Sequence, residues 1–302
     1  MTNFKIIQKR NIWLGVSVGM FVVCLAAILV WGLKLGIDFT GGSLLEVRFI
    51  GSRPEVNQVE ASLADLKLGS LIVQPVGDND LMLKFQETKE ETHQAILGAL
   101  TDLAKSNNQD DNIEELRFES VGPSIGRELK IKSLWAIFFA LIAMLAYITY
   151  AFRKVSKPVA SWKYATSAII AMLHDAVITV GIFAILGHFY GLEINIAFVA
   201  AILTVIGYSV HDSIVVFDRT RENLPKSNED FAGTVNTSLN QTLVRSIHTS
   251  LTSLLVLLAI IIFGGASIRT FVLALAIGIF AGTYSSIFVA SPMLVVWERW
   301  KK

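Results

Sequence analysis

The sequence has little charge for its length and a single cysteine. Of its 302 residues, 17% are charged and 53% are hydrophobic, whereas roughly 25% of an ordinary soluble domain is charged. The mean hydropathy is +0.56, so a water-soluble fold has no means of burying its apolar surface. Because Cys24 is the only cysteine, an intramolecular disulfide and a cysteine-based metal cluster are excluded. The formal net charge of +1 gives no indication of a nucleic-acid or acidic partner.

Apolar runs are abundant and long. Six of them are long enough to cross a bilayer as helices, namely residues 12–33, 134–152, 164–186, 194–217, 246–263 and 271–296. The first run follows basic residues, as a signal peptide does, but it holds about 22 uncharged residues, and secretory apolar cores have roughly 7 to 15. We therefore interpret it as a span and expect an all-α membrane bundle of six helices.

Basic residues are concentrated in alternate loops. They lie in the N-terminal tail, in the loops after spans two and four, and at the C-terminus: Lys5, Lys9, Arg10, Arg153, Lys154, Lys157, Lys163, Arg219, Arg221, Lys226, Arg299, Lys301 and Lys302. Because Lys and Arg accumulate on the cytoplasmic side, both termini are predicted to be cytoplasmic. The same rule holds for a plasma membrane and for an internal energy-transducing membrane such as a thylakoid, so both locations stay open.

A soluble segment separates the first span from the second. Alternating residues predict a first strand at 43–50, and Ser52 with Glu55 predicts a capping box that opens a helix to residue 66. Thr88 with Glu91 predicts a second box, for a helix to residue 105. The other strands are expected at 70–75, 81–85 and 114–119.

The resulting order, β-α-β-β-α-β, predicts an inserted α+β domain of the ferredoxin-like class. We therefore divide the chain into a tail with the first span (1–33), a domain beyond the membrane (34–132) and the remaining five spans (133–302).

Ionisable residues at membrane depth are costly and are therefore candidates for function. They lie in spans three, four and five: His174, Asp175, His211, Asp212, Arg245 and His248. Counting helical rise from the non-cytoplasmic ends places Asp212 and Arg245 at one depth, roughly 28 Å, and Asp175 at roughly 18 Å. Equal depth would allow Asp212 and Arg245 to pair.

Such a pair suits proton exchange. A nearby guanidinium favours an ionised carboxylate, and separation in an apolar medium favours the protonated form, so a conformational change would couple to proton uptake and release. A static ion pair between spans four and five stays open, as does a purely orienting polar contact for Asp175. The histidines are weaker candidates, because each points to a different face from its neighbouring aspartate and can bond a backbone group.

Other chemistries are disfavoured. His174, His211 and His248 lie at similar depths, but none of them belongs to a His-x-x-x-His or Glu-x-x-His pair that would place two metal ligands on one helix face, and no cofactor is indicated. Gly207-Tyr208-Ser209 lacks the second glycine of a serine nucleophile turn, because Val210 occupies that place. We therefore expect no enzymatic activity.

Some residues indicate packing instead of chemistry. Glycines four residues apart allow close helix approach, and two such pairs occur: Gly15 with Gly19, and Gly278 with Gly282. Residues 227–230 are expected to cap a helix lying on the membrane interface, with an apolar stripe of Phe231, Val235 and Leu239. Spans one, two and six, without ionisable residues, are interpreted as the frame of the bundle.

Three motifs, in this order, resemble the SecF family of bacterial Sec translocase subunits. They are Gly-Ile-Asp-Phe-Thr-Gly-Gly at 36–42, Val-Gly-Pro-Ser-Ile-Gly at 121–126, and the segment 206–223, which contains Tyr208-Ser209-Val210-His211-Asp212. The resemblance runs from the first span to Trp297. It implies a half-transporter of the resistance-nodulation-division (RND) superfamily that pairs with SecD and associates with the SecYEG channel, with YidC and YajC as further candidate partners.

The resemblance also implies a role for particular residues. Such a pair of subunits would use the proton motive force to promote late steps of polypeptide translocation, after the ATP-driven SecA motor has acted. The family's span-four aspartate and span-five arginine, implicated in proton transport, fall on Asp212 and Arg245, and its span-three pair falls on His174 and Asp175. His211 stands where asparagine is common and adds a titratable group beside Asp212.

Two further hypotheses stay open. One is an autonomous exporter of small molecules or lipids from the same superfamily, which is disfavoured because such exporters usually contain two six-span halves. The other is a structural assembly factor in which Asp212 and Arg245 never titrate.

Overall fold

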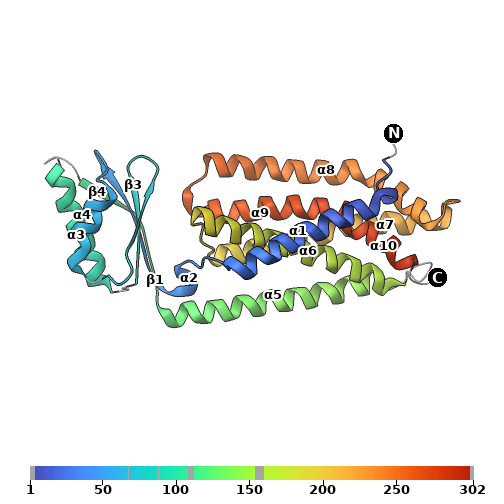
Figure 1. The fold of residues 1–302 in the computed structure, drawn as a ribbon, viewed down its shortest axis with the longest axis horizontal. Helices are drawn as coiled ribbons and strands as arrows, with labels where there is room; N and C mark the ends of the chain where they lie inside the picture. Colours follow the sequence, from blue (N-terminus) through green and yellow to red (C-terminus); the bar gives the residue numbers. More distant parts are fainter. Residues whose placement is uncertain (1–3, 67, 87–88, 108–111, 154–159, 300–302) are drawn as a thin grey trace. The chain divides into compact units, whose positions relative to one another are not determined.

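The structure, a computed structural model, describes residues 4–66, 68–86, 89–107, 112–153 and 160–299 (Figure 1). The chain forms two compact units, Leu35–Ser133 and a second unit that combines Met1–Lys34 with Leu134–Lys302. We describe each unit separately.

The second unit contains the helices that are long and apolar enough to cross a membrane, six among the described residues. They are α1 (Arg10–Trp31), α5 (Pro123–Ala151), α6 (Ser161–Tyr190), α7 (Ile196–Asn223), α8 (Phe231–Phe263) and α9 (Ala266–Ser285). The last span continues through a π-helical turn, η4 (Ser286–Ala290), into α10 (Ser291–Arg299). The six predicted spans are thus confirmed, and the chain is a multi-pass membrane protein.

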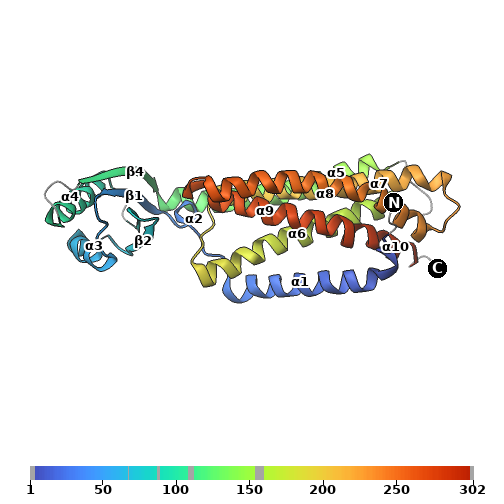
Figure 2. The ribbon, with the colours of Figure 1, turned by 90° about the horizontal axis from the view of Figure 1, so that it is seen from above.

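The six spans are buried to very different extents. At least half of the most apolar stretch is buried in α6, in α7 and in the last span, compared with 17% or less in α1, α5 and α8. Figure 2 shows α1 lying along α6 on the outside of the bundle. The interpretation of span six as frame is therefore wrong. Its small residues let it pack inside the bundle.

The interfacial helix predicted after span four is also wrong. Asp230 does cap a helix, since its Oδ1 accepts from the Gly233 amide at 2.8 Å, but that helix is the beginning of α8 itself. Val235 and Leu239 are fully buried, because they pack against residues of α7, of the last span and of the segment before α1. Asn240 binds that segment by accepting from the Phe4 amide at 2.8 Å and donating to the Phe4 carbonyl at 3.0 Å.

The first unit is a four-stranded antiparallel sheet with two helices. The strands are β1 (Gly42–Ile50), β2 (Ile72–Val76), β3 (Asp80–Phe85) and β4 (Asn112–Val121), in the order β2-β3-β1-β4. Alternate residues of β1 and β3 form a core with α3 (Val56–Leu63) and α4 (Glu90–Asn107). This arrangement confirms the predicted ferredoxin-like domain.

Of the two predicted helix caps, one is wrong and the other involves a residue outside the described part of the chain. Glu55 is itself the N-cap of α3 and forms a capping box with Gln58, whose Oε1 accepts from the Glu55 amide at 3.1 Å. The box of Ser52 with Glu55 is thus wrong by three residues: Glu55 takes the N-cap position, although the sequence pattern of a capping box expects Ser or Thr there. Thr88 lies outside the described residues, as do the orienting residues Lys154, Lys157, Lys301 and Lys302.

Candidate functional site

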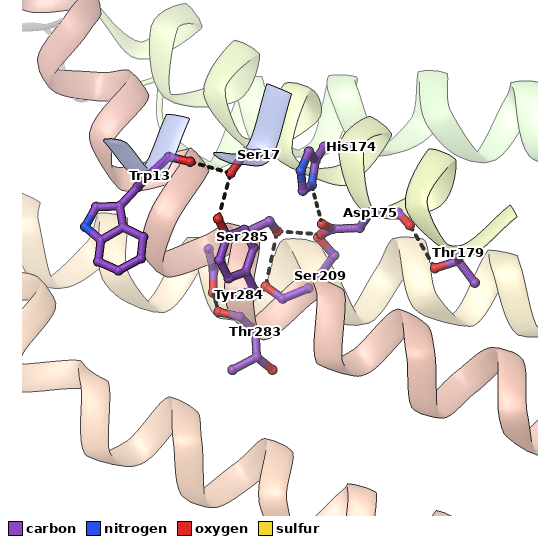
Figure 3. A network of polar contacts seen from close by, with 11 residues as sticks. Trp13, Ser17, His174, Asp175, Thr179, Ser209, Thr283, Tyr284 and Ser285 are labelled. Atoms are coloured by element: carbon purple, nitrogen blue, oxygen red, sulfur yellow. Dashed lines mark hydrogen bonds and ion pairs between the residues drawn. The ribbon is translucent and has the colours of Figure 1, made fainter. Parts of the chain in front are cut away.

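Asp175 lies near the middle of α6 and is completely buried. Its Oδ2 accepts hydrogen bonds from two hydroxyls, Ser209 of α7 at 2.5 Å and Ser285 of α9 at 2.6 Å. Its Oδ1 lies 3.0 Å from Nδ1 of His174. Figure 3 shows these three side chains converging on one carboxylate. A single acidic group thus joins three helices in the interior of the membrane unit.

Glycine makes this convergence possible. A Cβ on Gly282 would lie 3.2 Å from the Ser209 Cα and 3.6 Å from Asp175 Oδ2, and one on Gly278 would lie 2.1 Å from Val205. The predicted close approach is therefore confirmed at Gly278 and Gly282, where α9 meets α7.

The other predicted glycine pair behaves differently. No described atom beyond the helix's own backbone lies within 4 Å of a Cβ placed on Gly15 or Gly19. The close approach of α1 occurs at Gly181 of α6 instead, where a Cβ would lie 2.4 Å from that of Cys24.

A second set of polar contacts extends toward α1. The Ser17 hydroxyl donates to the Trp13 carbonyl at 2.9 Å and lies 3.0 Å from the Tyr284 hydroxyl (Figure 3). The His174 ring stacks between Phe21 and Tyr284, with its centroid 6.4 Å from each. The expectation that His174 and Asp175 point to different faces is wrong, because Nδ1 of His174 lies 3.0 Å from Asp175 Oδ1; Nε2 of His174 is buried without a hydrogen-bond partner among the described residues.

Asp212 forms a second buried acidic position. It is 4% exposed, and its Oδ2 has no hydrogen-bond partner in the described part of the chain. His211 of α7, with Arg245 and Ser246 of α8, lies near this carboxylate. No ion pair joins Asp212 to Arg245 within the described residues. The two residues are brought near one another, as expected, but they are not paired.

The depth difference predicted between the two aspartates is too large. Asp175 contacts Ser209, which precedes Asp212 by about 4.5 Å of helical rise, whereas the sequence count predicts roughly 10 Å. The count starts from the wrong helix ends, because α6 continues to Tyr190 and α7 begins only at Ile196.

Arg245 stands in the wall of a polar cleft between α7 and α8, with a volume of about 340 Å³. The lining residues are Val215, Asp218, Arg219, Glu222, Gln241, Thr242 and Arg245. Arg219 donates to Glu222 at 2.8 Å and to Gln241 at 2.6 Å, so its guanidinium is hydrogen-bonded to two other residues of the cleft wall.

Three ionisable side chains of the bundle point outward. His211, Arg245 and His248 are all exposed on the surface of the chain, at depths where ionisable groups are rarely left facing lipid.

Sequence reasoning missed Ser209 and Ser285. The sequence pattern presents Ser209 only as a possible nucleophile, and Ser285 lies in a span without charges. One signal was available, since Gly282 precedes Ser285 by three residues and so places the serine on the helix face that packs closely.

Comparisons with known proteins agree with this architecture. Residues 101–300 match the family "Protein export membrane protein SecD/SecF, C-terminal", and residues 26–49 match the "SecD/SecF GG Motif". The chain is 48% identical over 284 residues to the protein translocase subunit SecF of Thermobaculum terrenum, covering 90% of this chain and 87% of that protein. It is 39% identical to SecF of Anaerolinea thermophila, covering 97% of this chain and 94% of that protein.

Solved structures share the fold. The crystal structure of SecDF, a translocon-associated membrane protein from Thermus thermophilus, superposes with a TM-score of 0.82 at 33% identity and covers 99% of this chain. A second SecDF crystal structure, in a super-membrane-facing form, gives a TM-score of 0.69 at 31% identity over the whole chain. This chain spans 39% of the length of either SecDF chain. The chain therefore belongs to the SecD/SecF family, as a SecF-type subunit of the protein translocase and not an enzyme.

Proposed function

We propose that this chain works with a SecD partner to convert the proton motive force into late steps of polypeptide translocation that need neither SecA nor ATP. Two buried carboxylates in the interior of the bundle, Asp175 and Asp212, support this role. Relatives named as SecF support the translocase context.

The observation that carries the proposal is the unpartnered Oδ2 of buried Asp212. A buried carboxylate with an unpartnered oxygen is costly when ionised, so it gains from either a proton or a cation. Arg245 lies near enough to act on Asp212 yet forms no ion pair with it. Asp212 therefore alternates between two partners, a proton and the Arg245 guanidinium, with His211 as an adjacent titratable group. Asp175 and His174 form the neighbouring station of the same path.

The outward-facing residues support a partner in the membrane. His211, Arg245 and His248 would meet lipid if the chain acted alone, and such groups in membranes face protein or water instead. The SecDF chains are more than twice as long as this one, so a second half of similar design has room to cover α7 and α8. We assign that half to SecD, with SecYEG, YidC and YajC as further partners.

The charge pattern supports a location in the bacterial inner membrane with both termini in the cytoplasm. In that orientation the unit Leu35–Ser133 lies on the far side of the membrane, where it contacts emerging polypeptide.

The test is translocation of a secretory protein into inverted membrane vesicles under an imposed proton gradient. Asp212→Asn and Arg245→Met should abolish the gradient-dependent part of translocation and leave the ATP-dependent part intact. Asp65→Asn makes the same chemical change at an exposed position, and Lys226→Met removes one positive charge at another; neither should have an effect. Full gradient-dependent translocation in both membrane variants would mean that the chain is a structural assembly factor.

A further inference from the structure

Ser285 occupies a junction in the last span. It is the final residue of α9, directly before the π-helical turn η4, and it is completely buried. Its hydroxyl lies 2.6 Å from Asp175 Oδ2 and 3.2 Å from the Gly282 carbonyl oxygen. A hydroxyl has only one hydrogen to donate. Ser285 therefore has two acceptors in reach and must favour one of them.

The charge of Asp175 decides between these two acceptors. An ionised carboxylate only accepts, so Ser209 and Ser285 both donate to its Oδ2. Once Oδ2 carries a proton, it becomes a donor and one of the two hydroxyls must accept from it. Ser285 can do so by turning its own hydrogen to the Gly282 carbonyl, whereas the Ser209 hydroxyl has no second acceptor among the described residues.

The acceptor that Ser285 chooses matters because Ser285 directly precedes the π-helical turn η4. A π-turn holds one residue more than an α-helical turn, and such turns are common where helices carry function. Here the Ser291 hydroxyl also donates to the Ser286 carbonyl at 2.8 Å, five residues back, and so spans the turn. The bond from Ser285 to Asp175 ties the start of this turn to α6. When the Ser285 hydroxyl donates to the Gly282 carbonyl instead, protonated Asp175 donates to the Ser285 oxygen. The hydrogen bond between α6 and the start of the turn then has the opposite direction.

We propose that Ser285 is a hydrogen-bond switch that transmits the protonation of Asp175 to the π-helical turn of the last span. This inference rests on the proposed proton coupling and names the hydroxyl group that reorients in it. The switch adds one proton at Asp175 Oδ2 and reorients one hydroxyl hydrogen, so no covalent bond to Ser285 forms or breaks. Ser285 is a positioning residue, because it acts through Asp175.

Few other titratable groups surround Asp175. His174, on the same helix, contacts it at Oδ1 and not at the switching oxygen. Among the described residues, the remaining titratable groups of the central parts of α1, α7 and α9 make no hydrogen bond to the carboxylate: Cys24, Tyr208, His211, Asp212 and Tyr284. The proton that turns Ser285 is therefore the one that binds Asp175 itself.

Infrared difference spectroscopy tests the switch on the full chain with its SecD partner in proteoliposomes. Acidification from about pH 8 to about pH 5 should produce a carboxylic-acid C=O band that is absent in Asp175→Asn. In Ser285→Ala this band should move to higher frequency, because the acid loses its hydrogen-bond acceptor. Ser209→Ala, and Ser286→Ala as a neighbouring buried control, should leave the band in place. An unmoved band in Ser285→Ala, or an equal shift in Ser209→Ala, overturns the proposal.

Hydrogen exchange in the π-turn supplies an independent readout. Amide protection across Ser286–Ala290, with the exchange rate corrected for its intrinsic pH dependence, should decrease on acidification in the wild-type chain, stay constant in Ser285→Ala, and decrease again in Ser285→Thr, which keeps the hydroxyl. A decrease in protection that survives in Ser285→Ala contradicts the switch. If no carboxylic-acid band forms while gradient-dependent translocation is normal, the switch fails and the proposed function stands. If the band and the exchange respond while no variant or wild-type chain uses the gradient, the proposed function fails and the switch stands.

Discussion

Gly278 of α9 packs directly against Val205 of α7, so closely that a Cβ on the glycine would lie 2.1 Å from Cγ2 of the valine. Gly282, one turn further along α9, is within 3.2 Å of Ser209 by the same measure. These two contacts hold α9 near enough for Ser209 and Ser285 to reach one oxygen of Asp175. The close packing of these two glycines thus sets the geometry of the acidic site.

Replacing Gly278 tests this dependence. Gly278→Ala inserts a methyl group where Val205 already lies, and overpacking of this kind typically costs about 1–3 kcal/mol. The thermal unfolding midpoint in detergent should fall, and the Asp175 carboxyl band should change because α9 is displaced. Gly19→Ala is the matched control, since a Cβ there meets no described neighbour. Equal midpoints for the two variants would argue against the close α7–α9 contact.

The glycine pair at the start of β1 is expected to be intolerant of side chains. Gly42 has φ +123°, and a Cβ on it would lie 2.7 Å from the Phe85 carbonyl oxygen of β3. Gly42→Ala should therefore destabilise the unit Leu35–Ser133 by about 1–3 kcal/mol, seen as faster amide exchange in β1 and β3 of the full chain.

Gly98 provides the opposite control in the same unit. It lies within α4 and is exposed, and a Cβ added to it would have no described neighbour within 4 Å beyond the helix's own backbone. Gly98→Ala should stabilise α4 by about 0.5–1 kcal/mol. Destabilisation by both substitutions would contradict the role given to Gly42.

The ion pair between β1 and β3 predicts a dependence on pH. Hydrogen bonds from the Arg48 guanidinium, at 2.8 and 3.0 Å, hold the pKa of Asp80 below its usual range. Because the folded-state pKa is the lower one, the pair stabilises the fold above the unfolded pKa of about 3.9 and loses this effect as the pH falls through the folded value.

Amide exchange in β1 and β3 measures this effect. Protection should decrease between about pH 5 and about pH 3 in the wild-type chain. In Asp80→Asn it should be lower at neutral pH and should vary less over that interval. Glu60→Gln, an exposed substitution on α3, should follow the wild type. Identical profiles for Asp80→Asn and wild type would show that the pair contributes nothing to stability.

Much of this fold follows from patterns that act locally. The six spans depend on apolar length alone, and β1 depends on alternation between the core and the opposite face, so both are readable from the sequence. The cap of α3 was not predictable from the capping-box pattern, because that pattern expects Ser or Thr at the N-cap and the structure has Glu55 there.

The acidic site was only half predictable for a similar reason. Asp175 and Asp212 stand out because charge is rare in apolar helices. Ser209 and Ser285 do not, because hydroxyls are common in membrane spans and only the crossing of α7 with α9 gives these two a partner. The missing pair between Asp212 and Arg245 depends on side-chain conformation, which depth counting does not address.

Proton flux through the reconstituted chain and its SecD partner tests the central claim most directly. A pH-sensitive dye inside proteoliposomes would follow the collapse of an imposed proton gradient during translocation. Proton entry should be faster with the wild-type chain than with empty vesicles, and Asp212→Asn should reduce it to the empty-vesicle rate while Asp65→Asn does not. If Asp212→Asn vesicles lose their gradient as fast as wild-type vesicles do, Asp212 carries no protons and the account is contradicted.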